Sequence, residues 1–309
     1  MSKRIGYMFA GQGAQTPGMG RDLHEHSAAA RAVFAQADAI LGRPLADTCF
    51  HGTAEDLTAC ANCQPAITAM SLACLAAWTE RAAVAPVICG GLSLGEYAAL
   101  QAAGALSMPD AMRLVAERGR LMDLACRQSE GGMAAVIGGD PALIQSVCKT
   151  CGIDIANYNC PGQIVISGGR DGLRQAMQTL SAADLRVVEL QVAGAYHSRL
   201  MQPAADAFLP LLQACPITPP ACTVVQNATG QRETAPANIR GNLARQVSGS
   251  VRWEECARIM LAECDALIEF GPGAVLTGFI RRLDRQFPCA AVNSVAGLDS
   301  ACRLLAGLA

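Results

Sequence analysis

The sequence predicts an α/β protein that carries a second, compact α+β unit inside it, and three observations support this. Short apolar runs that lead into glycine, such as Ile5–Ala10, alternate with longer segments of helical spacing, as in a parallel sheet with crossover helices. Between residues 131 and 192 the order becomes β-α-β-β-α-β, which is that of a ferredoxin-like unit. Apolar residues are 51% of the 309, enough for a sizeable core, which excludes a disordered chain.

The elements before the insertion follow from periodicity and from turn residues. We expect strands at 5–10 and 84–89, because both are short apolar runs bounded by turn residues. Four segments have helical spacing: 21–42, 56–82, 97–105 and the one from Ser107 to about Arg127. The second should kink or restart at Gln64-Pro65, because proline lacks a backbone donor. Ser107 is expected to cap the fourth.

The insertion and the segment after it are assigned in the same way. In the insertion we expect strands at 131–138, 153–158, 163–167 and 185–192, helices at 141–150 and 171–182, and a turn at 159–162. Further on we expect strands at 223–227, 266–270 and 290–295, and helices at 199–212, 239–247, 253–262, from Val275 onwards and at the end of the chain.

Charge and hydropathy exclude several classes of protein. Lys plus Arg number 24 and Asp plus Glu 26, a net charge of −2, which argues against a nucleic-acid or anionic-membrane binder. No run approaches the roughly 18–20 uninterrupted apolar residues of a membrane span. The apolar run near the start is too short for the core of a signal peptide. We therefore expect a cytoplasmic protein.

The chain has 15 cysteines, an odd number that does not suit a small disulfide-rich scaffold. Two pairs, Cys60/Cys63 and Cys148/Cys151, have the C-x-x-C spacing of zinc or redox sites. Because the pairs are about 85 residues apart in the sequence, we expect reduced structural thiols and no metal.

Gly91-Leu92-Ser93-Leu94-Gly95 fits G-x-S-x-G, and it joins a predicted strand to a predicted helix. In a nucleophile elbow of this kind the glycines permit a sharp turn and the serine hydroxyl projects at the start of the helix. The Leu94 N–H can then point at a developing oxyanion. The alternative is a glycine-rich turn with Ser93 as a helix cap.

A nucleophilic serine needs a base, and the sequence offers four histidines. His24 and His26 lie among polar and Ala residues of a predicted helix, and His51 lies in a predicted loop. His197 alone stands at an element junction among small residues, which would admit a substrate. No acidic residue stands out as the third member of a triad, so a backbone carbonyl could orient the imidazole instead.

Two further features are open to a structural or a functional interpretation. Arg118 lies in mid-helix, where an arginine is usually solvated and paired with a nearby acid, but one facing the site could hold a substrate carboxylate in a bidentate manner. The loop from Gly11 to Gln15 could supply a second oxyanion donor, or it could be only a tight turn.

In combination these residues resemble the malonyl-CoA:acyl carrier protein transacylase family, the acyltransferases of fatty acid and polyketide synthesis. The resemblance covers about residues 4–300 and is carried by an ordered set of motifs: GQGAQ at 11–15, QPA at 64–66, GLSLGEYAAL at 91–100, ERGRLM at 117–122, GMAAVIG at 132–138, ANYNCPGQIVISG at 156–168, GAYHSRLM at 194–201, Gln246 before VRW, and EFGPGAVLTGFI at 269–280. Each motif is weak alone, and the ordered set is specific.

The resemblance implies an α/β-hydrolase-like large domain, residues 1–128 and 197–309, and an inserted ferredoxin-like small domain, residues 129–196. By motif position it implies that Ser93 is the nucleophile and His197 its base. It also implies that Arg118 binds the malonyl carboxylate and that the N–H groups of Gln12 and Leu94 form the oxyanion hole.

Further roles follow from the same resemblance. Gln246 would orient His197 through its main-chain carbonyl, and Met122 would lie beside the substrate. Tyr196 resembles the bulky residue of malonyl-selective members, where it should crowd an α-methyl group. Leu92 departs from the histidine that many members carry before the nucleophile.

The implied activity is ping-pong transfer of malonyl from malonyl-CoA to the phosphopantetheine thiol of acyl carrier protein, through a malonyl-serine. It needs no bound cofactor and no metal, and the implied partner is a transiently bound acyl carrier protein. We expect a monomer with no nucleic-acid or membrane partner. The alternatives are a serine thioesterase or hydrolase, an acyltransferase of polyketide synthesis or malonate metabolism, and a carrier-docking module without activity.

Overall fold

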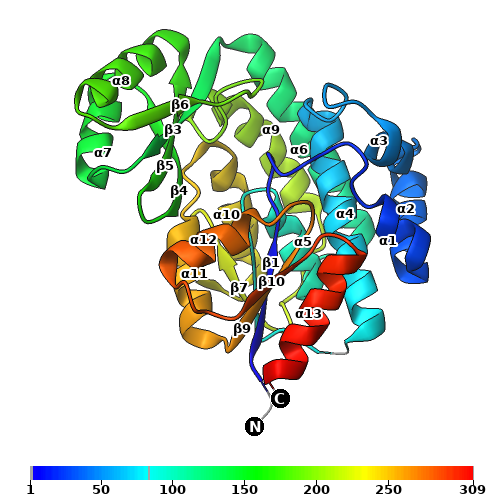
Figure 1. Ribbon diagram of the computed structural model, residues 1–309. Coiled ribbons are helices and arrows are strands. Elements are labelled where there is room, and N and C mark those ends of the chain that lie inside the picture. The colour runs from blue at the N-terminus through cyan, green and yellow to red at the C-terminus, as the bar shows by residue number, and fades with distance from the viewer. Residues whose placement is uncertain (1–2, 83, 309) are drawn as a thin grey trace.

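The computed structural model describes residues 3–82 and 84–308 and contains two sheets (Figure 1). The larger has the strand order β10-β9-β1-β2-β7-β8, and its neighbouring strands are parallel except for the β7–β8 hairpin. Its strands are β1 (Ile5–Phe9), β2 (Ile88–Gly91), β7 (Thr223–Gln226), β8 (Gln231–Glu233), β9 (Ala266–Phe270) and β10 (Cys289–Val292). This confirms the α/β class.

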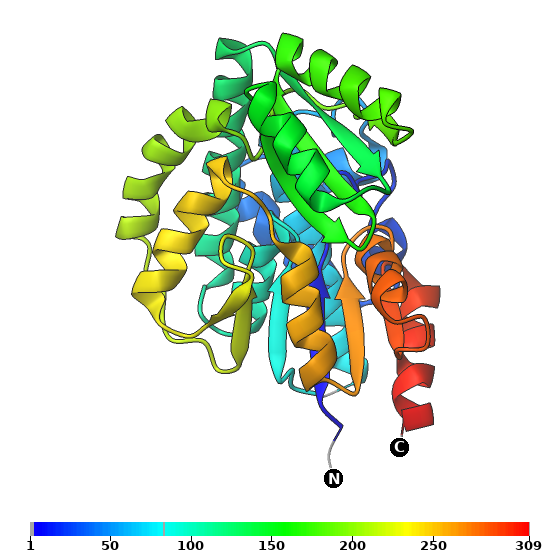
Figure 2. The same cartoon turned by 90° about the vertical axis from the view of Figure 1, so that its left-hand side faces the viewer.

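Helices cover both faces of the large sheet, because its strands are apolar on both sides. Tyr7 and Phe9 of β1 belong to the core on one face, and Met8 between them belongs to the core on the other. The first face is covered by α4 (Cys60–Arg81), α5 (Gly95–Ala102) and α13 (Val295–Leu308), and the second by α11 (Trp253–Glu263) and α12 (Val275–Leu283). Figure 2 shows the strands between these layers.

The remaining helices of the large α/β part extend the first layer. They are α1 (Arg21–His26), α2 (Ala28–Leu41), α3 (Leu45–His51), α6 (Met108–Gln128), α9 (Gln202–Ala214) and α10 (Pro236–Ser248), with a 3₁₀ turn η1 (Arg199–Met201) before α9. Ser107 caps α6 by accepting from the Asp110 N–H, as its sequence position predicts.

The second sheet is antiparallel, with the order β4-β5-β3-β6. Its strands and helices are β3 (Gly131–Ile137), α7 (Pro141–Thr150), β4 (Asp154–Cys160), β5 (Gln163–Gly169), α8 (Arg170–Ala182) and β6 (Arg186–Glu189). Ala134 and Val136 pack against α7 and α8, whereas Met133 and Ala135, on the other side of β3, join the main core. This unit therefore turns one sheet face toward the large sheet.

The structure corrects the expected break at Pro65, because α4 runs through it without interruption. A proline inside a helix leaves the carbonyl four residues earlier without its donor. Here the Ala61 carbonyl instead accepts from the Arg43 guanidinium at 2.6 Å. The Arg43 side chain, which is distant in sequence, thus replaces the missing donor. The helix can continue through Pro65 without leaving that carbonyl unpaired.

Several other expectations at element ends are wrong. The strand expected at 84–89 is β2 and spans 88–91, and His51, which was expected in a loop, is the last residue of the helix α3. The segment 21–42 is two helices rather than one, because Ser27 ends α1 and caps α2 by accepting from the Ala30 N–H. Residues 159 and 160 belong to β4 rather than to the turn, which is reduced to Pro161-Gly162. Asn159 therefore lies on a strand, and its side chain faces one side of the small sheet.

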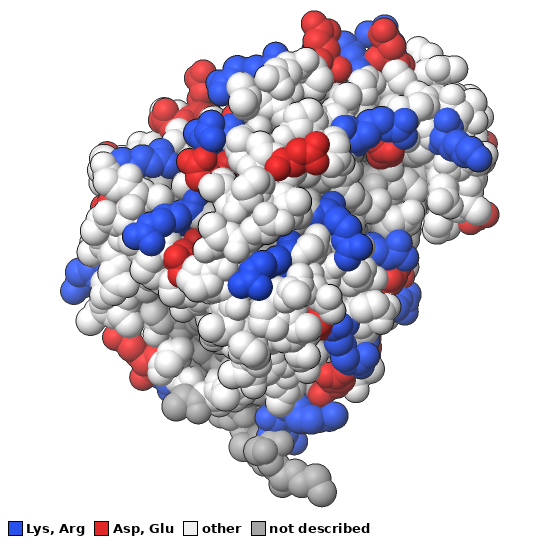
Figure 3. All heavy atoms as spheres, turned by 180° about the vertical axis from the view of Figure 1, so that it is seen from behind, with Lys and Arg blue, Asp and Glu red and all other residues white. Residues whose placement is uncertain are grey.

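The surface carries charges of both signs. Seen from behind, Lys and Arg are interspersed with Asp and Glu, as the near-zero net charge suggests (Figure 3). Of the described helices, α4 alone is long and apolar enough to cross a membrane, but 78% of that window is buried inside the protein. Burial of this kind is typical of a core helix.

Candidate active site

The carboxyl ends of the central parallel strands meet at one edge of the large sheet, below the small sheet (Figure 1). The segments after these strands carry the chemistry: Gln12 follows β1, Ser93 follows β2 and Asn227 follows β7. Such an edge is where open α/β sheets bind their ligands.

Ser93 occupies a sharp turn between β2 and α5, with a left-handed φ of 50°. The flanking glycines are required by close packing. A Cβ at Gly91 would lie 2.0 Å from the Gly95 carbonyl carbon, and one at Gly95 would lie 2.2 Å from the Phe9 oxygen. The strained serine between two such glycines is the geometry of a nucleophile elbow.

Asn227, which directly follows β7, is hydrogen-bonded to the turn that carries Ser93. Its Oδ1 accepts from the Ser93 N–H at 2.5 Å, and its Nδ2 donates to the Gly91 carbonyl at 2.9 Å. Its own N–H donates to Glu96 Oε1 at 2.6 Å. The side chain is completely buried, so these bonds fix the turn on both sides of the serine.

His197 lies against the serine. Its Nε2 is 2.7 Å from Ser93 Oγ, and its Nδ1 is 2.8 Å from the Gln246 main-chain oxygen. Because a carbonyl can only accept, Nδ1 carries the proton and Nε2 is left as the acceptor for the serine proton. The backbone carbonyl therefore occupies the position that a carboxylate takes in an ordinary triad.

Burial, and to a smaller extent the nearby charge of Arg118, lower the pKa of His197 from 6.5 to about 4. The hydrogen bond to the Gln246 carbonyl opposes this shift. At neutral pH the imidazole is therefore uncharged and able to accept a proton.

Arg118 is 1% exposed, on the inward face of α6. Its Nη2 atom donates to Ser93 Oγ and to Gln246 Oε1, each at 3.0 Å. Its Nη1 atom donates to Gln64 Oε1 at 2.9 Å. All three acceptors are uncharged, and the buried Nε has no partner within the described residues. A buried cation bonded in this way retains unused capacity for an anionic ligand.

The side chain of Gln246 links this guanidinium to the elbow. Its Nε2 donates to the Ser93 carbonyl at 2.9 Å and to Glu96 Oε2. Burial raises the pKa of Glu96 to about 8, so this carboxyl group gives up its proton less readily than an exposed one. Gln246 thus contacts His197 through its backbone and Arg118 through its side chain.

Another part of the site is built from α4 and the loop after β1. Burial raises the pKa of Cys60 to about 11, and its thiol donates to the Tyr196 hydroxyl at 3.0 Å. The amide of Gln12 donates to the Cys60 sulfur at 3.3 Å. Gln64 Nε2 reaches Met122 Sδ at 3.4 Å. Tyr196 and Met122 are therefore fixed in place beside the serine.

A cavity of about 380 Å³ lies between the two sheets, and its lining includes Gln12, Ser93, Arg118, Met122, Tyr196 and His197. Among the described residues, the N–H groups of Gln12 and Leu94 have no hydrogen-bond acceptor. A larger hollow of about 610 Å³ lies between α8 and β6, but Ser93 and His197 do not line it.

The structure thus brings together the residues predicted for the site, and it adds Gln64, Glu96 and Asn227. His24, His26 and His51 and the pair Cys148/Cys151 do not line the cavity. Gln64 and Glu96 lie inside recognised motifs, yet periodicity alone could not distinguish them from helical core. Asn227 is the last residue of the strand predicted at 223–227, and a polar residue at the carboxyl end of a strand was a usable signal. The 15 cysteines all lie in the described part and are unpaired. No group of three or more His, Cys, Asp or Glu in that part could hold a metal ion.

The chain as a whole is similar to several known proteins. The model of the acyl transferase domain family matches residues 6–298. A malonyl CoA-acyl carrier protein transacylase of Bacillus subtilis is 38% identical over 99% of this chain and 98% of its own length. The crystal structure of an acyl-carrier-protein-S-malonyltransferase from Bartonella henselae has a TM-score of 0.94 at 37% identity, covering 98% and 99% of the two chains.

A further solved structure contains a partner. It is a type II PKS acyl-carrier protein, in the holo form, in complex with its malonyl-transacylase. The similarity has a TM-score of 0.93 at 35% identity, over 97% of this chain and 99% of the other.

Proposed function

The chain belongs to the acyl transferase domain family, and on that premise we propose that it transfers a malonyl group from malonyl-CoA to the phosphopantetheine thiol of acyl carrier protein. One observation carries the choice of acyl group. Arg118 is a buried cation that contacts the nucleophile and is bonded only to uncharged groups. A dicarboxylic half-thioester supplies the missing negative charge, and acetyl-CoA does not.

The first half-reaction acylates Ser93. His197 Nε2 takes the hydroxyl proton while Oγ forms a bond to the thioester carbonyl carbon. The N–H groups of Gln12 and Leu94 stabilise the oxyanion of the tetrahedral intermediate. As that intermediate collapses, the carbon–sulfur bond breaks, and coenzyme A leaves as its thiol with the proton from His197.

The second half-reaction repeats these steps in reverse order, with the phosphopantetheine thiol of the carrier in place of the coenzyme A thiol. His197 removes the proton from the phosphopantetheine thiol, whose sulfur attacks the malonyl-serine carbonyl. The serine oxygen leaves and recovers the proton from His197. The Gln246 carbonyl holds the Nδ1 proton in both halves, so the imidazole keeps one tautomer.

Three other positions complete the proposal. Arg118 binds the malonyl carboxylate, and Met122 packs beside the acyl chain. Tyr196, held by Cys60, crowds the α-carbon and disfavours a methyl branch. The two separate sheets support a division into residues 1–128 with 197–309 and residues 129–196. We place the reaction in the cytoplasm, with no bound cofactor.

Two alternatives share this site. A thioesterase would pass the malonyl group to water. An acyltransferase of polyketide synthesis would use the same residues with another carrier, and one solved relative is bound to a carrier of that type. The chemistry proposed for Ser93, His197 and Arg118 is the same for either carrier.

The test is the intact mass of the protein after brief mixing with malonyl-CoA, for the wild type and for Ser93→Ala. We expect a malonyl-sized increase in the wild type, none in the variant, and discharge by holo acyl carrier protein. The apo carrier lacks the thiol and is the matched control. Release of free malonate at the same rate with either carrier form would identify a hydrolase and overturn the proposal.

A further inference from the structure

Two cysteines outside the active site are in contact in the large sheet. Cys89 belongs to β2 and Cys222 directly precedes β7, and their Sγ atoms are 3.7 Å apart although 133 residues separate them in the sequence. All 15 cysteines lie in the described part of the chain, and this is the only hydrogen bond between two of their thiols there. Neither residue lines the active-site cavity or enters the proposed reaction steps.

The pairing of the two strands brings the thiols together. β2 and β7 are parallel, and Cys89 lies opposite Val224, two residues after Cys222. Because strand side chains two residues apart point the same way, Cys222 is turned toward the sheet face that carries Cys89. Both side chains pack with the core on that face. Neither C-x-x-C motif takes part, so that spacing could not predict the contact.

The two cysteines differ in their access to solvent. Cys89 is fully buried, whereas Cys222 is partly exposed. A hydrogen bond from the Cys89 thiol to the ionised Cys222 sulfur lowers the pKa of Cys222, and burial raises the pKa of Cys89. The thiolate is the nucleophilic form of cysteine, so a small oxidant from solvent should react first at Cys222. The Cys89 thiol is then in contact with the oxidised sulfur.

A disulfide requires only a small movement from this arrangement. Bonded sulfurs lie about 2.05 Å apart, so the two Sγ atoms must approach each other by roughly 1.7 Å. Cys222 lies in a bend, and the paired register of β7 with β2 begins only at Thr223. The Cys222 backbone is therefore not fixed by the strand ladder and can make this adjustment. Cys89 stays in place, because β2 pairs with both β1 and β7.

We propose that Cys89 and Cys222 form a modification site at which a peroxide converts the two thiols into a disulfide. This inference does not depend on the proposed function. The Cys222 sulfur attacks one peroxide oxygen, the oxygen–oxygen bond breaks, and a sulfenic acid and one molecule of water are formed. The Cys89 sulfur then bonds to the Cys222 sulfur, and the sulfenic oxygen leaves as a second water with the Cys89 proton. The two thiols lose two electrons in total, and hydrogen peroxide gains them.

The disulfide has two consequences for the protein. A sulfenic acid without a partner thiol is oxidised further to a sulfinic acid, which thiols do not reduce, so Cys89 keeps the oxidation of Cys222 reversible. The bond also ties β2 to β7, the strands that precede Ser93 and Asn227. A link between residues so distant in sequence restricts the unfolded chain and thereby stabilises the folded one.

The test maps the disulfides of the whole chain after exposure to hydrogen peroxide without denaturant. Remaining thiols are blocked with iodoacetamide, and tryptic peptides are analysed by mass spectrometry with and without reductant. Cys222 shares its tryptic peptide with Cys215, whereas the peptide of Cys89 contains no second cysteine. Cys215→Ser is therefore the matched control, because it leaves Cys222 as the only thiol in that peptide.

We expect a linked peptide pair of Cys89 and Cys222 in the wild type and in Cys215→Ser, and its disappearance on reduction. No link should form in Cys222→Ser. In Cys89→Ala, Cys222 should instead gain the two oxygen atoms of a sulfinic acid. The urea midpoint of the oxidised wild type should exceed that of the reduced protein, with no such shift in Cys222→Ser.

The wild type alone is sufficient to overturn the proposal, whatever the variants do. Peroxide treatment that leaves both thiols free for alkylation, or that turns Cys222 into a sulfinic acid although Cys89 is present, would exclude the site. Loss of the link in Cys215→Ser would assign it to Cys215 instead. A lower urea midpoint after oxidation would show that the link forms in unfolded molecules, and would exclude the site as well.

Discussion

Arg118 and Arg120 lie two positions apart on α6, and the helix directs their side chains into different surroundings. Arg120 is exposed and pairs with Glu117 at 2.9 Å, whereas Arg118 is buried against Ser93. The exposed pair is worth little, because water and salt screen it. The buried guanidinium is held by neutral groups, so a ligand carboxylate would be its strongest partner.

Replacing Arg118 by alanine should reduce kcat/KM for malonyl-CoA by about 100-fold, since a bidentate charge-assisted contact contributes about 3 kcal/mol. Relative activity toward acetyl-CoA should rise, because the uncharged donor no longer leaves the arginine without its counter-charge. The measurement is transfer to holo carrier from each donor. Arg120→Ala, two positions along the same helix, is the control. Unchanged malonyl selectivity in Arg118→Ala would show that this residue does not bind the carboxylate.

The pKa of His197 leads to a prediction about acid conditions. Because it is lowered to about 4, the base form predominates above that pH, and the rate of Ser93 acylation should be flat from about pH 5 to pH 8. Below about pH 4 the imidazole is protonated and acylation should fall tenfold for each pH unit. In Arg118→Met, assayed with acetyl-CoA, loss of the positive charge should raise the pKa of His197 and so move this acid limb of the pH–rate profile to higher pH. A wild-type limb near 6.5 would contradict the lowered value.

At the scale of elements, the elbow depends on how closely α5 approaches β1. The first residue of α5, Gly95, sits against the Phe9 carbonyl, so the helix can begin directly after the nucleophile. Gly278 in α12 is exposed, and a Cβ added there would have no other atom within 4 Å. The same substitution should therefore have opposite effects at these two helical positions.

Gly95→Ala should lower the free energy of unfolding by about 3 kcal/mol or more, because the new methyl group meets rigid backbone. Gly278→Ala should raise it by about 0.5–1 kcal/mol, through better helix propensity. Urea denaturation of both variants measures these changes. A stable Gly95→Ala protein with full acylation activity would mean that the elbow tolerates a wider turn than its geometry indicates.

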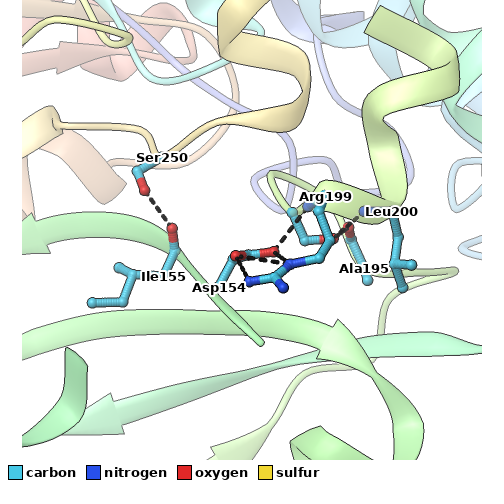
Figure 4. A network of polar contacts seen from close by, with 7 residues as sticks. Asp154, Ile155, Ala195, Arg199, Leu200 and Ser250 are labelled. Atoms are coloured by element: carbon cyan, nitrogen blue, oxygen red, sulfur yellow. Dashed lines mark hydrogen bonds and ion pairs between the residues drawn. The ribbon is translucent and has the colours of Figure 1, made fainter. Parts of the chain in front are cut away.

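At the scale of the whole molecule, the active site exists only because two domains meet. Ser93 and His197 line its cavity from the large α/β part, and side chains of the small sheet, such as Met133 and Val165, line the same cavity. The link through Asp154 and Arg199 joins the two units (Figure 4), and these side chains are 27% and 62% exposed. A pair this accessible to solvent contributes modestly to stability. We expect the pair to have a larger effect on the position of β4 relative to the cavity.

A double-mutant cycle with Asp154→Ala and Arg199→Ala should give a coupling of no more than about 1 kcal/mol in the free energy of unfolding. The KM for malonyl-CoA should rise several-fold in either variant, with a smaller change in kcat, because β4 carries cavity residues and not the reacting groups. Arg174→Ala, which breaks a pair within α8, is the control. A fall in kcat with KM unchanged would show that this link instead positions His197.

Local signals account for much of what the sequence determined by itself. The period-2 and period-3.6 patterns, the cap at Ser107 and the glycines around Ser93 act within a few residues, so they can be read without the fold. Two of the misjudged positions have distant causes. Pro65 stays helical because Arg43 satisfies the carbonyl of Ala61. Asn159 joins a strand because β5 pairs with it further than the turn residues suggested.

The candidate site divides in the same way. The sequence alone could name Ser93 and His197, and the resemblance of ordered motifs supplied roles for Arg118 and for the Gln246 carbonyl. Only the tertiary structure decided that Arg118 is buried, with Gln64 and Gln246 as its partners 54 and 128 residues away. Burial and such contacts arise when both faces of a sheet are covered, which depends on the whole chain at once and cannot be encoded in any local pattern.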